Sequence, residues 1–315
     1  MADNKKILAM KKWLLRILLF IVLLIGSYTA LYWQNDIPLE TLKKKYCNEQ
    51  SKFIAINGQQ IHYRDEGNGY PLVLVHGTSS SLHTWDAWAN ELKNDFRIIR
   101  MDIPAFGITG ETKERDYTIE NYVKFINDFT TALGVDTFYL AGNSLGGEIT
   151  WNYAYSHPER VKKMILIDAA GYKRTGPTPL AFIIAKNSVL NKVMTKVTPK
   201  RIIEKSMHDI YYDDSKVTDS VVTHYFEMLL RPGNRQAFAD RVRVIKYEAE
   251  EKVNKIKTRT LIQWGQYDNW ILPEDAEKFK KDIVGSEVKY YSAGHVPMEE
   301  LPAETAKDAK DFLKK

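Results

Sequence analysis

A serine between two glycines is the feature of this sequence that indicates chemistry most directly. Gly142, Ser144 and Gly146 follow an apolar run at residues 137–141 and precede a helix-like segment at residues 148–155. A serine hydroxyl is a weak nucleophile, so it needs a base beside it and backbone N–H groups that bind the oxyanion formed on attack. A tight turn exposes the hydroxyl, and the glycines let the neighbouring backbones approach closely. We therefore predict that Ser144 is a catalytic nucleophile.

The partners that such a serine requires follow other strand-like runs. Asp268 comes after residues 260–264, and His295 comes after residues 288–291. We predict that His295 is the general base and that Asp268 orients it and stabilises its cation. The predicted oxyanion hole consists of the N–H groups of Thr78, in a glycine-containing loop, and Leu145, which follows the nucleophile.

Other residues compete for these roles. Asp168 also ends a strand-like run and is the alternative carboxylate, although we expect it to bond loop amides. Asp102 is likewise expected to organise a loop. Six further histidines are less suitably placed for a general base: His62, His76, His83, His157, His208 and His224.

The apolar pattern predicts an α/β fold. Short β-rich runs alternate with helical segments, and Asn57-Gly58 predicts a hairpin between the first two runs. Continuous apolar strands separated by helices are typical of a mainly parallel sheet covered on both faces. The eight runs occupy residues 53–56, 61–64, 72–75, 97–101, 138–140, 164–167, 260–264 and 288–291.

A long interval without an obvious core strand separates Asp168 from Thr260. Its helical character predicts a cap at residues 172–251, inserted after the sixth strand, with the core formed by residues 51–171 and 252–315. The apolar segments 180–185 and 225–230 either line an acyl pocket or pack the cap against the core, and the sequence leaves both interpretations open.

The N-terminus predicts a membrane anchor. Five basic residues precede an uncharged stretch at residues 17–33, and about 20 apolar residues span a bilayer. Trp13 and Trp33 fit the aromatic belts at membrane interfaces. A cleaved signal peptide is the rival interpretation, but the run is long and lacks a clear small-x-small cleavage site. We predict a tail and transmembrane helix at residues 1–35, a connector at 36–50, a cytoplasmic N-terminus, and a catalytic domain on the periplasmic, extracellular or luminal side.

Composition excludes several classes of protein. The 315 residues are 44% hydrophobic and 27% charged, which fits a globular domain, and the formal net charge of +5 is dispersed. No basic stripe indicates nucleic-acid binding. The single cysteine, Cys47, excludes an intramolecular disulfide framework and a cysteine-based metal cluster. No dinucleotide fingerprint or metal cluster is visible, so no cofactor is expected.

These motifs together resemble a known family. From about residue 53 to residue 313 the chain resembles the α/β-hydrolase superfamily, in its lid-bearing serine esterase/lipase branch. The resemblance rests on residues 76–78, 142–147, 264–268 and 294–297, and it extends to membrane-anchored monoacylglycerol lipases and meta-cleavage-product hydrolases. Residues 76–80 also resemble haloalkane dehalogenases, but those enzymes carry aspartate at the position of Ser144. Ala105 departs from the family pattern, in which glycine is usual.

The resemblance implies a membrane-anchored serine hydrolase that cleaves carboxylic esters of small, lipid-like molecules, with monoacylglycerols or medium-chain acyl esters as the expected substrates. Two alternatives remain. One is a C–C bond hydrolase of ring-cleavage-type diketones, and the other is a catalytically silent binding protein on the same scaffold.

Overall fold

One mixed sheet forms the centre of the molecule. The computed structural model describes residues 2–176 and 178–315. Eight strands lie in the order β1-β2-β4-β3-β5-β6-β7-β8, and neighbours from β4 to β8 pair in parallel, whereas β2 is antiparallel to both β1 and β4. The predicted eight-stranded, mostly parallel sheet is therefore confirmed. The strands are β1 Lys52–Ile56, β2 Gln59–Glu66, β3 Tyr70–Val75, β4 Phe96–Met101, β5 Phe138–Asn143, β6 Val161–Ile167, β7 Arg259–Gly265 and β8 Glu287–Tyr291.

The β1–β2 hairpin forms where Asn57-Gly58 predicts it. Ile56 pairs with Gln59 across a two-residue turn, and both turn residues have positive φ, 49° for Asn57 and 79° for Gly58. Asparagine and glycine tolerate this conformation better than other residues, and it matches the twist of the flanking strands.

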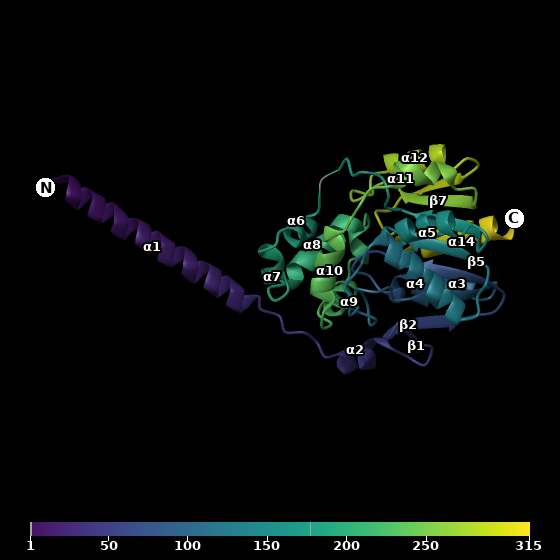
Figure 1. The fold of residues 1–315 in the computed structure, drawn as a ribbon, viewed down its shortest axis with the longest axis horizontal. Helices are drawn as coiled ribbons and strands as arrows, with labels where there is room; N and C mark the ends of the chain where they lie inside the picture. The colour runs from purple at the N-terminus through teal and green to yellow at the C-terminus, as the bar shows by residue number, and fades with distance from the viewer. Residues whose placement is uncertain (1, 177) are drawn as a thin grey trace.

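Two apolar layers cover the two faces of the sheet, as the alternation of side chains along β3 shows. Val73 and Val75 point into a cluster with α4 and α5, whereas Leu72 and Leu74 point into a cluster with α3 and α14. Helices therefore pack on both faces, as predicted (Figure 1). The core helices are η1 Leu82–Trp85, α3 Asp86–Leu92, α4 Ile119–Ala132, α5 Leu145–Ser156, α12 Glu274–Asp282, α13 Pro297–Glu300 and α14 Pro302–Lys314.

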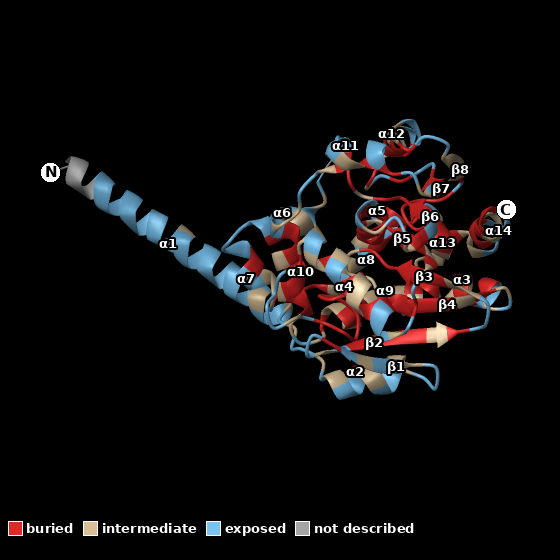
Figure 2. Cartoon of the chain, turned by 45° about the vertical axis from the view of Figure 1, so that its right-hand side comes forward, coloured by how far each residue is buried: buried red, intermediate tan, exposed pale blue. Residues whose placement is uncertain are grey.

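The segment between β6 and β7 is helical. Figure 1 shows most of its helices gathered at one end of the sheet, on the side from which α1 extends. The short helix α11 instead lies beside α12 in Figures 1 and 2, so the cap boundary at residue 251 stays a prediction. The helices are α6 Leu180–Lys186, α7 Leu190–Met194, α8 Lys200–Ile210, η2 Asp214–Lys216, α9 Asp219–Leu229, α10 Asn234–Arg243, α11 Ala249–Lys252 and η3 Val253–Lys255.

The N-terminal helix α1, Ala2–Leu31, projects away from the rest of the protein, and Figure 2 shows it mostly exposed from Lys6 onward. Its segment Lys6–Leu31 is long and apolar enough to cross a membrane, a property that a signal sequence shares. The region predicted as a polar connector contains a further helix, α2 Leu39–Tyr46. Its Leu42 is buried in a small cluster with Ile108 and Met228, so this connector is packed against the domain.

Candidate active site

The turn at Ser144 has the backbone geometry of a strained strand-to-helix connection. Ser144 joins β5 to α5 with φ 55° and ψ −117°, a conformation that L-residues with side chains rarely adopt. A Cβ atom on Gly142 would lie 2.1 Å from the carbonyl oxygen of Gly146, and one on Gly146 would lie 2.0 Å from that of Val75. Both glycines are therefore required, because helix α5 passes too close to β5 and β3 for any side chain.

A buried hydrogen bond joins His295 to Asp268. The distance from Nδ1 of His295 to Oδ2 of Asp268 is 2.7 Å, and both side chains are almost fully buried. The other carboxylate oxygen of Asp268 accepts hydrogen bonds from the backbone N–H groups of Trp270 and Ile271, at 2.7 and 3.0 Å. This carboxylate is therefore fixed in position, and its bond to Nδ1–H leaves Nε2 of His295 as the unprotonated, basic nitrogen.

Asp168 lies beside His295 and Asp268. Its Oδ1 accepts a hydrogen bond from the N–H of Gly265 at 2.9 Å, and polar atoms of Asp168, Asp268 and His295 all lie within 4.8 Å of one another. Burial and the neighbouring Asp268 carboxylate raise the pKa of Asp168 well above its usual value. Burial therefore disfavours a charge on Asp168, whereas Asp268 is the carboxyl group that contacts His295 directly.

The same three residues have the donor atoms of a metal site. However, the contact of 2.7 Å between His295 and Asp268 is a hydrogen bond, which uses the nitrogen and oxygen that a shared ion would need. The arrangement fits an acid–base pair better than a metal centre.

The loop that carries Thr78 is held by a buried polar network. His76 accepts a hydrogen bond from the N–H of Ile103 through Nε2 and contacts Gly77 O through Nδ1, and burial lowers its pKa, so it is a neutral structural residue. Asp102 accepts hydrogen bonds from the N–H groups of Leu82 and Ile108 at 2.7 Å and contacts His62 Nδ1 at 2.8 Å. The role expected of Asp102, organising a loop, agrees with these contacts.

Ala105, where the family pattern has glycine, has φ 88° and is fully buried. This is the left-handed region that favours glycine, so Ala105 adopts a backbone conformation that glycine would adopt with less strain. Alanine in place of glycine therefore introduces local strain in the loop that follows β4.

One cavity of about 390 Å³ brings the predicted residues together. Ser144, His295, Thr78 and Leu145 all line it, while Asp268 lies behind His295. Leu145 is the first residue of α5, and N–H groups in the first turn of a helix have no partner within the helix. The oxyanion hole predicted at Thr78 and Leu145 therefore remains a geometrically reasonable prediction.

The cavity also contains a buried ion pair. Nη2 of Arg241 lies 2.9 Å from a carboxylate oxygen of Glu148, and burial raises the pKa of Glu148 to about 6. Among the described residues, Nε and Nη1 of Arg241 have no hydrogen-bond partner. A residue in the wall of a largely apolar cavity therefore has two buried donors without a partner.

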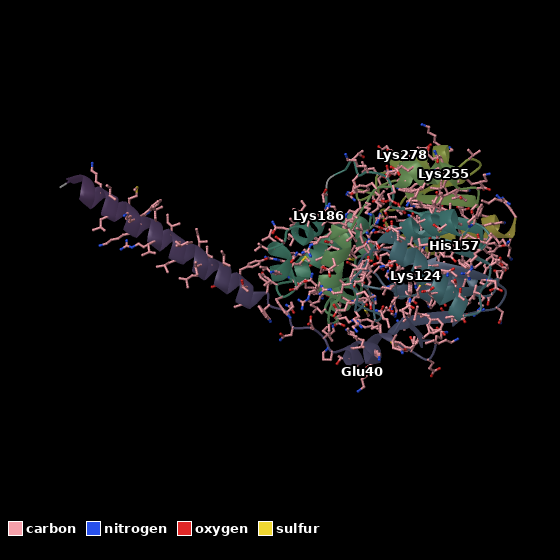
Figure 3. All side chains as sticks on the ribbon, in the orientation of Figure 1. Glu40, Lys124, His157, Lys186, Lys255 and Lys278 are labelled. Carbon is pink, nitrogen blue, oxygen red and sulfur yellow. The ribbon has the colours of Figure 1, made fainter. Side chains whose placement is uncertain are left out.

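The other histidines lie away from this arrangement or have structural partners. His157 follows the last residue of α5, roughly 20 Å along the helix from Ser144, and its side chain is partly exposed (labelled in Figure 3). His83 and His224 pack against each other as part of an aromatic group with Tyr46. His62 is bonded to Asp102.

Sequence reasoning missed two residues that hold the site together. The side-chain amide of Asn143 donates hydrogen bonds to the backbone carbonyls of Ile167 and His295, at 3.2 and 3.0 Å. Glu300 accepts a hydrogen bond from the N–H of Gly294 at 2.6 Å. Asn143 stands inside the glycine-flanked motif, but nothing in its spacing indicates that it reaches the histidine loop.

Comparison with known proteins agrees with this architecture. The alpha/beta hydrolase fold family matches residues 70–302. Lipase 3 of Moraxella sp. (strain TA144) is 26% identical over 311 residues, covering 93% of this chain and 95% of the lipase. The 2-hydroxy-6-oxo-2,4-heptadienoate hydrolase of Pseudomonas putida is 28% identical. The match covers 78% of this chain and 90% of that hydrolase.

Two further similar proteins are a monoacylglycerol lipase and a hydrolase of solved structure. Monoacylglycerol lipase abhd6-A of Xenopus laevis is 26% identical. The match covers 90% of this chain and 84% of the lipase. The structure of a meta-cleavage product hydrolase from Pseudomonas fluorescens IP01 superposes with a TM-score of 0.75 at 23% identity, covering 85% of this chain and 99% of that one. Since the family match covers well over half of the residues, this chain belongs to the α/β-hydrolase fold family and is a hydrolase.

Proposed function

We propose that this protein is a serine hydrolase that cleaves carboxylic esters through a triad of Ser144, His295 and Asp268. The observation that carries the proposal is the hydrogen bond of 2.7 Å between Asp268 and His295, with His295 lining the same cavity as a serine held at positive φ. A nucleophile, an oriented base and a buried acid are the parts that acyl transfer requires.

In the proposed reaction, Nε2 of His295 removes the proton from Ser144 Oγ as the oxygen attacks the ester carbonyl. The N–H groups of Thr78 and Leu145 bind the oxyanion. The tetrahedral intermediate collapses, His295 gives its proton to the departing alcohol, and an acyl-enzyme remains. Water, deprotonated by His295, then releases the acid and restores Ser144. Asp268 stabilises the imidazolium in both halves of the reaction.

The residues that line the cavity favour a substrate with an apolar acyl group. Cap residues such as Phe182, Met194 and Leu229 line the cavity together with Ser144. Two relatives are lipases by name, which supports monoacylglycerols or medium-chain acyl esters as substrates. The apolar helix α1 supports a membrane anchor, with the basic N-terminus on the cytoplasmic side and the hydrolase domain across the membrane.

Labelling with a fluorophosphonate probe tests the nucleophile. The full-length protein should be labelled, and Ser144→Ala should abolish both labelling and ester turnover, with a loss in kcat on the order of 10⁴ to 10⁶. Ser156→Ala, at the exposed end of the same helix α5, is the matched control and should behave like the unaltered protein. Undiminished esterase activity in Ser144→Ala would refute the assignment.

One observation favours a second function, hydrolysis of C–C bonds in ring-cleavage products. Arg241 lines the cavity and has two donors, Nε and Nη1, without a partner among the described residues, and a carboxylate or ketone oxygen of a substrate would satisfy such donors. A relative at 28% identity is named as a hydrolase of a dienoate. Parallel assays with p-nitrophenyl esters of graded chain length and with a ring-fission dienoate distinguish the two functions, because the preferred substrate has the higher kcat/KM.

A further inference from the structure

The chain that leaves α1 is joined directly to the cap. Trp33 forms a β-bridge with Val197, and the N–H of Gln34 donates to Lys196 O at 2.7 Å. The guanidinium of Arg201 lies 4.8 Å from the ring centre of Tyr32. Figure 1 shows the end of α1 beside α7. These contacts place the turn between α7 and α8 where α1 ends.

The cap exposes apolar side chains at this same place. Among exposed large aliphatic side chains that follow α1 in the described chain, all but Val284 lie on α6, α7 and the turn between them. Single exposed apolar residues are ordinary, but a cluster marks a surface that meets something other than water. The cluster, which we term the cap tip, consists of Leu180, Ile183, Val189, Leu190 and Val193, with exposed fractions from 47% to 68%.

The stretch of chain that carries the cap tip is rich in basic residues, two of which, Lys196 and Lys200, pair with Asp36 and Asp219 from other segments. Residues 172–203 contain seven lysines and arginines and no aspartate or glutamate. Lys186, labelled in Figure 3, ends helix α6 within this stretch. Apolar side chains surrounded by basic ones are the composition of segments that lie in a membrane interface, where lysine and arginine meet lipid phosphates.

The active-site cavity reaches the cap tip. Leu190 and Val193 of α7 and Tyr28 of α1 line the same cavity as Ser144 and His295. The cavity is therefore lined both by the proposed catalytic residues and by residues of the cap tip and of the apolar helix.

We propose that the cap tip inserts into the bilayer leaflet around the end of α1, and that substrate passes from that leaflet into the cavity. The bilayer is the occupant that the structure favours, because the cap tip is continuous with the helix that spans it. Insertion itself depends only on the membrane-spanning role of α1, whereas passage of substrate rests on the proposed ester hydrolysis.

Insertion is tested by fluorescence quenching in the full-length protein. In a Cys47→Ser background, Val189→Cys and Val284→Cys each receive an environment-sensitive fluorophore. Both valines are exposed, at 68% and 89%, but Val284 follows α12, away from α1. In nanodiscs that contain phospholipids with nitroxides on their acyl chains, we expect quenching at position 189 to exceed quenching at position 284 severalfold.

Equal quenching at the two positions would overturn the proposal. So would quenching at position 189 that appears only in discs holding two protein copies, because the cap tip would then be an interface between copies. This measurement requires no turnover, so it stands even if the protein proves not to be an esterase.

Passage of substrate is tested by kinetics. The double variant Ile183→Ser/Val189→Ser changes two cap-tip residues that do not line the cavity, and Val284→Ser is the control. We expect the double variant to hydrolyse a long-chain monoacylglycerol in vesicles at least tenfold more slowly, and p-nitrophenyl acetate in water at a rate within twofold of the unaltered protein. An equal fall for both esters, or no fall for the vesicle ester, would contradict passage from the bilayer. If the unaltered protein hydrolyses neither ester, the proposed function itself fails.

Discussion

Asn143 donates a side-chain hydrogen bond of 3.0 Å to the backbone carbonyl of His295, across 152 residues of sequence. The residue before the proposed nucleophile, Ser144, thus holds the loop that carries the proposed base, His295. Because a second bond to Ile167 O fixes the amide, Asn143 positions Ser144 and His295 relative to each other.

We expect Asn143→Ala to lower kcat by about 10- to 100-fold and to change KM little, since small displacements of reacting groups have effects of that size. The thermal unfolding temperature should fall only slightly. Steady-state kinetics on a soluble ester, with circular dichroism as a folding check, measures both. A variant with unchanged kcat would show that the bond is structural only.

Replacing each carboxyl group in turn distinguishes the two buried aspartates. Asp268→Asn should lower kcat by about 10⁴-fold, because the amide does not stabilise the imidazolium of His295. Asp168→Asn should lower kcat less than tenfold, since the amide oxygen still accepts the N–H of Gly265 and burial beside Asp268 already raises the pKa of the carboxyl group it replaces. Equal losses in the two variants would show that Asp168 shares the catalytic charge.

The buried pair of His62 and Asp102 predicts a pH dependence of stability. Burial lowers the pKa of His62, but the Asp102 carboxylate outweighs it and raises that pKa to about 9. Because the folded-state pKa exceeds the unfolded value of 6.5, the contribution to stability is complete below pH 6.5 and is lost as pH rises through 9. The loss amounts to at most about 3 kcal/mol.

Thermal unfolding in detergent at pH 6, 7.5 and 9.5 measures this loss. His62→Gln removes the titrating group, so the difference in stability between the variant and the unaltered protein should shrink as pH rises. Cys47, whose Sγ lies 3.7 Å from His62 Nε2, also contributes to the raised pKa of His62, and Cys47→Ser in both proteins removes that contribution. A difference that stays constant with pH would show that His62 is neutral in the folded protein.

Ala105 offers a test of local strain. With φ 88° it occupies a conformation that costs a non-glycine residue on the order of 1 kcal/mol or more. Ala105→Gly relieves this strain, whereas Ala89→Gly, at a buried position of α3, relieves none. Both variants lose one buried methyl group, so Ala105→Gly should be more stable than Ala89→Gly by about 1 kcal/mol or more. Thermal unfolding of the two proteins gives the comparison, and equal stabilities would argue against strain at position 105.

The sequence by itself determined the features that depend on neighbouring residues. Apolar runs predicted all eight strands, Asn57-Gly58 predicted the hairpin, and the glycines around Ser144 predicted a turn that is tight enough to exclude side chains. These features are local, because strand propensity, turn conformation and close backbone approach each leave a pattern within a few positions of the chain.

Tertiary structure decided the features that join distant segments. Asp168 and Asp268 both follow strands, and only the fold shows that Asp268 contacts His295 while burial beside it raises the pKa of Asp168. The bond from Asn143 to His295 and the bridge from Trp33 to Val197 likewise join segments that are far apart in sequence. No local pattern encodes such contacts, because burial and partner distance arise only when the sheet brings its strand ends together and the cap closes over them.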